Sequence, residues 1–194
     1  MTVTDGRVLR RVRNKDAAVD AILDLLQEGV TAPTAQQVAA RSGVSLRSIF
    51  RLFEDVEGLN AAAVQRQAAR IESLLVPLPE SGPLFVRIAA LVDSRATIWD
   101  AIAPVRRHAV RLAAGSEVLG SELARTHRFF RRQVRAVFAA EIGGDDELLD
   151  ALDAAASWET WELLRSGRGL SRAAAARVVT RTLTALLADK EFSR

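Results

Sequence analysis

Basic and hydroxyl side chains recur on one face of a short amphipathic stretch of the chain. At about 100° per residue, Arg47, Ser48 and Arg51 share one side of a helix, and Ile49 and Phe53 occupy the other. Guanidinium and hydroxyl groups on an exposed helical face can donate hydrogen bonds to the phosphates and base edges of DNA. This face is therefore the first candidate for binding chemistry in the sequence.

Two short helices joined by a tight turn would present that face. Thr34 is predicted to cap the first helix, with Gln37 as its capping-box partner, and Ser45 is predicted to cap the second. Gly43 can adopt the left-handed conformation that the turn requires. A small-residue turn between two short helices is typical of a helix-turn-helix, whose second helix fits the DNA major groove.

The predicted contacts with DNA follow from this arrangement. Arg47 lies at the exposed start of the second helix, where a guanidinium can bind guanine O6 and N7, and Arg51 is placed for a phosphate. Leu46 is expected to be exposed, either against a thymine methyl group or as incidental surface. Thr34 and Gln36 begin the first helix, whose amides can meet a phosphate, although their role could be capping alone. The full predicted set is Arg10, Arg11, Arg13, Thr34, Gln36, Ser45, Leu46, Arg47, Ser48, Phe50 and Arg51.

The formal charge is concentrated around this segment. Residues 1–53 hold eight Lys and Arg against five Asp and Glu, and the remainder holds nineteen of each, so the net charge of +3 arises in the N-terminal part. We expect a basic arm before a helix that begins at Asn14, where it could contact phosphates. The alternative is a solvated, disordered tail.

Composition argues against several other classes of protein. The chain has no Cys and no apolar run of about 18 residues, and its basic N-terminus lacks the apolar region of a secretory signal. These features favour a cytoplasmic protein without a membrane span. His108 and His127 are nineteen positions apart and match no metal-binding spacing, and no nucleophile with its base can be named. We therefore expect no enzyme activity, no catalytic residue, no metal and no cofactor.

Helical periodicity runs through almost the whole sequence, and strand signals are nearly absent. The prediction is an all-α fold of about nine helices, with a three-helix helix-turn-helix domain over 1–56 and a C-terminal effector-binding and dimerisation domain over 57–194. Three prolines and a glycine within 76–83 mark the clearest break. Beyond it, helices are predicted over 84–102, 106–114, 117–142, 146–166 and 172–189.

The predicted helix over 146–166 is apolar on two faces. Its leucines and alanines share one face, and Trp158 and Trp161 point to roughly the opposite side. Such a helix must be covered on two sides, either by a second copy in a two-fold dimer or as the central helix of a monomeric bundle. Glu159 lies among the leucines on the first face. It could be an exposed residue at the edge of that face, the partner of a buried Arg, or a ligand contact.

Aromatic and imidazole side chains of the C-terminal part could line a small-molecule pocket, although a Trp at helical spacing is more often core. The predicted ligand-binding residues are Trp99, His108, Phe130, Trp158 and Trp161, with His127 as a further candidate. His108 could bind an acidic or polar ligand or lie on the surface. Arginines over 128–135 form a solvated face or bias a ligand toward anions.

The N-terminal part resembles the TetR family of bacterial transcriptional regulators. Within residues 14–60 the match consists of Val38-Ala39, Gly43-Val44-Ser45, Ile49-Phe50-Arg51, Phe53 and Leu59, and SWETWELLR further on looks like a feature of one branch. The resemblance implies a homodimer with an N-terminal DNA-binding domain. It also implies a variable C-terminal domain that binds a ligand and dimerises through its last two helices.

The sequence departs from the family pattern at three positions. Phe50 stands in place of the usual Tyr, Leu52 in place of His and Val56 in place of Lys, so three common phosphate contacts are lost or weakened. Phe50 is expected to pack within the small domain with its edge facing the DNA backbone. We expect the basic arm, Arg47 and Arg51 to replace the missing anchoring.

These observations favour a ligand-responsive DNA-binding regulator. It would be a repressor that binds a palindromic operator on double-stranded DNA as a homodimer and is released by a small-molecule effector. The alternative is a helical module that binds small molecules or proteins and has weakened DNA affinity. Phe50, Leu52 and Val56 favour this alternative.

Overall fold

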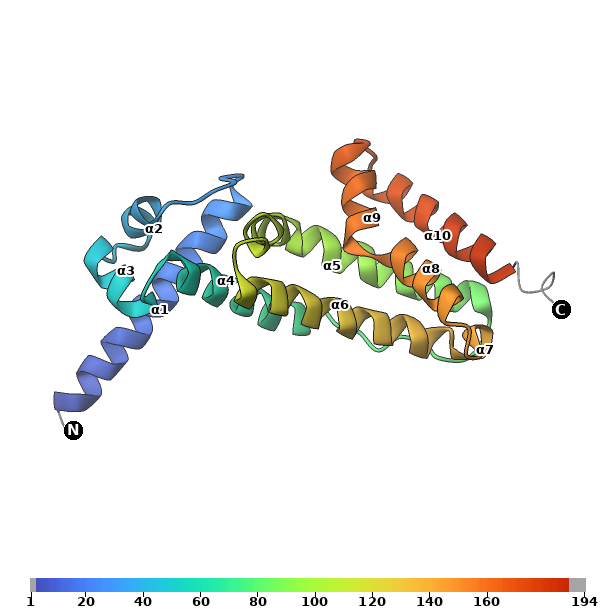
Figure 1. Cartoon of the computed structure of the whole chain (residues 1–194), viewed down its shortest axis with the longest axis horizontal. Helices are drawn as coiled ribbons and strands as arrows, with labels where there is room; N and C mark the ends of the chain where they lie inside the picture. Colours follow the sequence, from blue (N-terminus) through green and yellow to red (C-terminus); the bar gives the residue numbers. More distant parts are fainter. Residues whose placement is uncertain (1–2, 189–194) are drawn as a thin grey trace. The chain divides into compact units, whose positions relative to one another are not determined.

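Helices account for most of residues 3–188, the part of the chain that the computed structural model describes (Figure 1). No strand occurs in this part of the chain, which confirms the predicted all-α fold. The contacts divide it into two compact units: unit 1 contains residues 3–73 and 102–124, and unit 2 contains residues 74–101 and 125–188. Between residues 3 and 188, no helix is both long and apolar enough to span a membrane.

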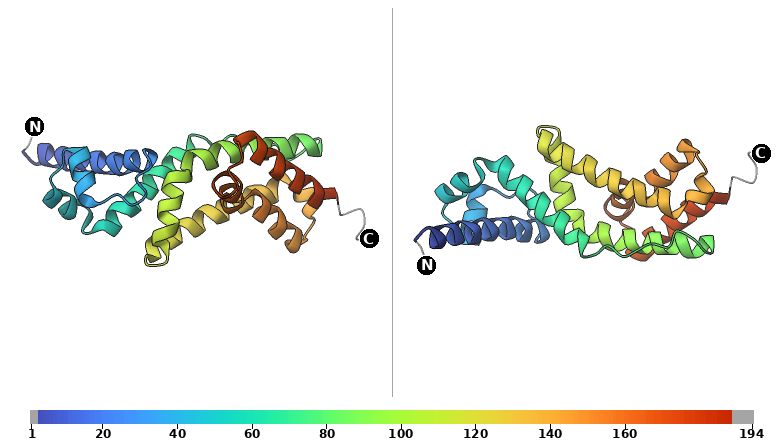
Figure 2. Two further views of the ribbon diagram at one scale, coloured as in Figure 1. Left: turned by 90° about the horizontal axis from the view of Figure 1, so that it is seen from above. Right: turned by 90° about the horizontal axis from the view of Figure 1, so that it is seen from below.

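Unit 1 is assembled around the first helix. Its elements are α1 (Val3–Gln27), α2 (Ala35–Ser42), α3 (Leu46–Phe53), α4 (Val56–Glu72), the later part of α5 (Leu84–Ala113) and the start of α6 (Glu117–Val137). Ile22, Val38, Ile49, Leu59 and Val105 are buried in one cluster, so α1 to α5 share a core. Figure 2 shows α2 and α3 beside α1. The amphipathic face predicted for the second short helix is what anchors α3 in this core.

Unit 2 combines the first part of α5 and the rest of α6 with shorter helices. These are α7 (Ala139–Ile142), α8 (Asp146–Ala156), α9 (Trp158–Glu162), a π-helical turn (Leu163–Gly167) and α10 (Arg172–Ala188). α10 packs on α8, and Arg172 Nη2 donates to Thr97 Oγ1 of α5 over 2.7 Å. Figure 2 shows α10 (red) alongside the first part of α5 (green). The predicted end of this last helix, at position 189, lies outside the described residues.

The first helix is longer than predicted. α1 begins at Val3 rather than Asn14, and the side chains from Gly6 to Arg13 lie on exposed turns of that helix. Once the buried turns around Ile22 have nucleated a helix, each further residue adds a backbone hydrogen bond at little cost. The predicted basic arm is therefore an extension of α1.

One predicted break and one predicted continuous helix are also wrong. α5 continues through Pro104, which was expected to divide it. Ile102, Ala103 and Val105 around the proline are buried, and this packing offsets the lost backbone hydrogen bond. Conversely, the single helix predicted to reach Ile142 ends at Val137 and is followed by the separate turn α7.

The predicted helix over 146–166 is interrupted at Ser157. This residue is extended (φ −70°, ψ 160°), and its Oγ accepts from Thr160 N over 3.1 Å, so it caps α9 as a new helix. The two faces predicted by treating 146–166 as one continuous helix are therefore not aligned across the break. Trp158 and Trp161 are 6% and 2% exposed within the single chain, and the second apolar face needs no external cover.

Candidate nucleic-acid interface

Both helices of the predicted helix-turn-helix have the predicted caps. Gln37 N donates to Thr34 Oγ1 over 3.2 Å, and Thr34 N donates back to Gln37 Oε1 over 2.9 Å, which completes a capping box on α2. Gly43 ends α2 in the left-handed region at φ 70°. Ser48 N donates to Ser45 Oγ over 3.3 Å at the start of α3. The turn that sets the angle between α2 and α3 is thus fixed by these short-range hydrogen bonds.

α3 presents one exposed and one buried face. Ile49 and Phe53 are 1% and 6% exposed and enter the core of unit 1, whereas Arg47 and Arg51 are exposed. Two apolar side chains differ from expectation. Leu46 is half-buried rather than fully exposed, and Phe50 is 42% exposed rather than packed inside.

The arginines of unit 1 divide into paired and free cations. Arg41 forms a bidentate ion pair with Glu28 (2.8 and 2.6 Å), which ties the end of α2 to the segment after α1, and this pairing lowers the pKa of the Glu28 carboxyl. Arg66 and Arg70 of α4 pair with Asp20 of α1. Among the described residues, no acidic partner contacts Arg10, Arg11, Arg13, Arg47 or Arg51. All five arginines predicted to meet DNA are therefore free of acidic partners within the described part of the chain.

The remaining predicted residues lie on the same two helices. Gln36 is exposed on the first turn of α2, next to the cap residue Thr34. Ser45 Oγ donates to Ser48 Oγ over 2.9 Å, which leaves the Ser48 hydroxyl hydrogen available for an outside acceptor. The structure therefore brings the α2, α3 and α1 candidates together in one unit, and their contact with DNA stays a prediction.

A tight turn after α3 was not predicted. Glu54 has φ 66° and ψ −50°, and Asp55 N donates to Phe53 O over 2.7 Å, which is a γ-turn. A Cβ on Gly58 would lie 2.2 Å from Phe53 O, so only glycine fits where α4 passes under this turn. Gly58 itself was the available signal in the sequence.

Two side-chain contacts fasten α4 to α5 and α6 within unit 1. His108 of α5 is 5% exposed, with Nε2 3.0 Å from Asn60 Oδ1 of α4 and Nδ1 3.3 Å from Thr31 O. Burial lowers the pKa of His108 against the opposing effect of Thr31 O, and Arg111 lowers it further. Ser116 Oγ donates to Glu57 Oε1 over 2.6 Å and caps α6. His108, predicted as a ligand contact, here fills an interhelical polar position.

The fold matches solved structures of transcriptional regulators. A transcriptional regulator from Rhodococcus sp. Rha1 superposes with a TM-score of 0.65 at 18% identity, over 92% of this chain and 96% of the other. A TetR-family transcriptional regulator from Streptomyces coelicolor gives a TM-score of 0.60 at 20% identity, over 98% and 85%. This chain has the TetR-family fold. No protein-family model and no curated protein matches it.

The three departures from the TetR-family sequence pattern have different environments. Leu52 is half-buried and packs against the core of unit 1, whereas Val56 is 40% exposed at the start of α4. The exposed ring of Phe50 retains an apolar face without a hydroxyl. None of the three side chains can donate a hydrogen bond to a phosphate.

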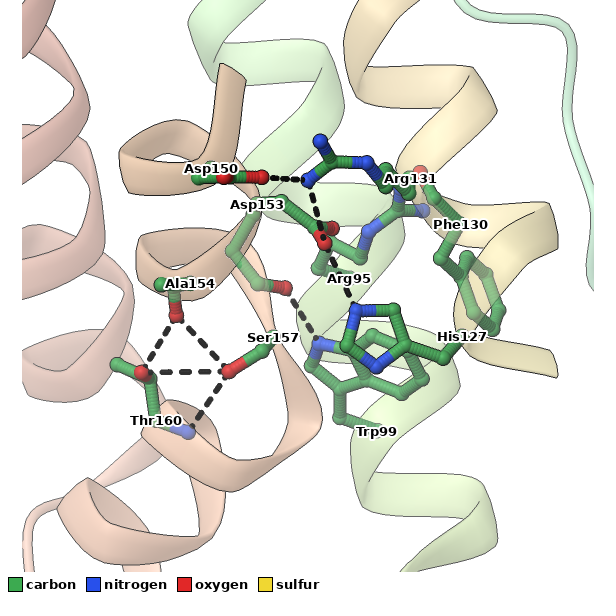
Figure 3. Close-up of polar contacts among 11 residues, drawn as sticks. Arg95, Trp99, His127, Phe130, Arg131, Asp150, Asp153, Ala154, Ser157 and Thr160 are labelled. Atoms are coloured by element: carbon green, nitrogen blue, oxygen red, sulfur yellow. Dashed lines mark hydrogen bonds and ion pairs between the residues drawn. The ribbon is translucent and has the colours of Figure 1, made fainter. Parts of the chain in front are cut away.

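Of the other predicted ligand residues, which all lie in unit 2, Trp99, Phe130, Trp158 and Trp161 are buried and His127 is exposed. The rings of Trp99 and Phe130 meet edge to face with centroids 4.5 Å apart, and Trp99 Nε1 donates to Ala156 O over 3.1 Å. Trp161 Nε1 donates to Asp100 Oδ1 over 2.9 Å. His127 Nε2 lies 2.8 Å from Asp153 Oδ2 (Figure 3). Trp99, Phe130 and His127 therefore lie together, and Glu159 is exposed on α9.

Proposed function

We propose that this chain is a TetR-family transcriptional regulator that binds double-stranded DNA through α3. The observation that carries the proposal is the division of cations in unit 1. Arg47 and Arg51 project from a capped, core-anchored helix and have no acidic partner among the described residues, whereas Arg41, Arg66 and Arg70 are paired. Free guanidiniums on such a helix are suited to base edges and phosphates.

The regulator acts as a homodimer on a palindromic operator. Two-fold symmetric half-sites require two recognition helices, and the fold match is to regulators of this class. Exposed apolar side chains that a partner would cover remain near the end of the described chain: Leu163 in the π-helical turn is 55% exposed, and Val178 on α10 is 40% exposed. These side chains, and not the buried Trp158 and Trp161, support pairing through the last two helices.

An effector in unit 2 releases the repressor from DNA through α5 and α6. Both helices contribute residues to unit 1 and to unit 2. Their unit 1 parts are fastened to α4 by the contacts of His108 with Asn60 and of Ser116 with Glu57. A ligand that binds one arrangement of these helices more tightly shifts the population away from the arrangement that fits the half-sites.

The second candidate is a helical ligand-binding or protein-interaction module with weak DNA affinity. Phe50, Leu52 and Val56 favour it because they cannot make the phosphate contacts of the family's Tyr, His and Lys.

A gel-shift assay with the DNA upstream of the chain's own gene distinguishes the two candidates. We expect a shift at low salt with the full chain, a loss of at least tenfold in affinity with Arg47→Ala, and no change with Arg132→Ala, an exposed arginine on α6. Absence of any shift at low salt would leave the second candidate.

A further inference from the structure

Unit 2 encloses a cation that has no acidic partner. Arg95 of α5 is 2% exposed, and its guanidinium carbon lies 4.5 Å from the ring centroid of Phe130 and 5.7 Å from that of Trp99. Nη1 donates to Gln133 Oε1 over 2.8 Å and Nη2 to Phe130 O over 3.2 Å. Nε has no hydrogen-bond partner. Among the described residues, no carboxylate forms an ion pair with Arg95.

The nearby acidic group is already occupied. Asp153 Oδ2 of α8 lies 2.8 Å from His127 Nε2 and 3.6 Å from Arg131 Nη1. Arg131 Nη1 also forms an ion pair with Asp150 Oδ1 over 2.5 Å. Figure 3 shows Arg95, Trp99, Phe130 and His127 gathered beside this set of ion pairs. Asp153 attracts Arg95 only at longer range, and burial lowers the pKa of Arg95 to about 10.

A buried guanidinium whose direct contacts are all neutral is unfavourable for folding. Burial removes the water that hydrates the guanidinium. The two neutral oxygen acceptors and two aromatic rings around it recover only part of the lost hydration free energy. An apolar side chain of similar size would fill the same space without this cost. The positive charge is therefore explained better by an anion that enters the site than by the stability of unit 2.

We propose that Arg95 binds the carboxylate of a small acidic effector. A carboxylate oxygen is a stronger acceptor for a guanidinium than an amide oxygen, so the ligand displaces the half-buried, flexible side chain of Gln133 from Nη1. The unpartnered Nε gives the guanidinium a further donor for the same anion. This assignment rests on the proposed regulator function, since it names the chemical class of the effector.

The side chains around Arg95 also indicate the chemical character of the part of the ligand outside its carboxylate. Phe129 is half-buried and meets Phe130 edge to face with centroids 5.2 Å apart. Together with Trp99, these rings offer apolar contact next to a guanidinium that forms no ion pair of its own among the described residues. The ligand expected here is a monocarboxylic acid with an aromatic or aliphatic body.

Calorimetric titration and thermal melting of the full chain test the assignment. The probes are benzoate, phenylacetate and octanoate, each compared with its neutral amide. We expect the acids to bind and raise the melting temperature, and the amides to bind at least tenfold more weakly. Arg95→Met should lose at least tenfold in acid affinity without a fall in the melting temperature of the free protein. Arg128→Met, which removes an exposed arginine of the same helix α6 as Gln133, should bind acids like the wild type.

Three results would overturn the assignment: no binding of any acid, equal binding of acids and amides, or retained acid affinity in Arg95→Met. If Arg95→Met fails to fold, Gln133→Leu provides the test, because removal of the competing amide should tighten acid binding at least threefold. Unchanged or weaker binding in that variant would also overturn the assignment. DNA binding without ligand is measured separately, so its absence would count against the regulator function alone.

Discussion

Among single residues, the arginines of unit 1 differ in whether an acidic side chain already pairs with them. Arg41 and Arg51 lie on neighbouring helices of unit 1 and are both exposed, yet only Arg41 is paired, with Glu28. The sequence predicted the free cations of α3 from helical periodicity. It could not predict which other arginines are neutralised, because Glu28 and Arg41 meet only through the tertiary packing of α1 and α2.

Replacing Arg51 should therefore change the salt dependence of DNA binding. We expect Arg51→Ala to reduce the slope of log K against log salt by about 1, because one phosphate contact is lost. Fluorescence anisotropy across a salt series measures the slope. Arg41→Ala is the matched control and should leave the slope unchanged; an equal fall in both variants would show that pairing does not decide which arginines contact DNA.

His108 should make the stability of the protein depend on pH. Its folded-state pKa is lowered by burial, so the folded state favours the neutral ring. This contribution is complete above the unfolded pKa of about 6.5 and is lost as the pH falls below it, because the unfolded chain then binds more protons. Urea unfolding at pH 7.5 and pH 5 should show a smaller loss of stability in His108→Gln than in the wild type. Equal losses would exclude this role.

At the scale of elements, the sequence predicted helices well where local signals determine them. The caps at Thr34, Gly43 and Ser45 depend on neighbouring residues only, and they are found as predicted. The continuation of α5 through Pro104 and the break at Ser157 depend on burial and on a cap inside an apolar run. Neither feature is visible in helical periodicity. Because of the break at Ser157, Trp158 and Trp161 are buried within the chain and do not form the predicted second apolar face.

The turn between α3 and α4 provides the test at this scale. Gly58→Ala should destabilise the protein by about 1–3 kcal/mol, because its Cβ would collide with Phe53 O in a turn that cannot relax easily. Gly120→Ala in α6 is the control: its Cβ would meet nothing closer than 3.9 Å, and the better helix propensity of Ala predicts a neutral or stabilising effect of up to about 1 kcal/mol. Thermal melts measure the difference, and equal melting temperatures for the two variants would show that the turn tolerates a Cβ at position 58.

At the scale of the whole molecule, the two compact units share the helices α5 and α6. Under the proposed function, a change that an effector made in the unit 2 part of either helix would act on a segment whose other part is bonded to α4. The sequence predicted a boundary between DNA-binding and effector domains after residue 56, and this boundary stays a prediction. What periodicity could not reveal is that residues 102–124 belong to the unit that contains the helix-turn-helix.

In the proposed function, two copies of α3 read a two-fold symmetric DNA site. A footprinting experiment with the full chain on its own upstream DNA tests it most directly, together with the stoichiometry of the complex. We predict two protected half-sites related by a two-fold axis, with centres about one helical turn of DNA or a multiple of it apart. Two chains should bind per site, and Arg47→Ala should abolish protection at the same protein concentration. A single unpaired protected segment, or no protection even at low salt, would contradict the account.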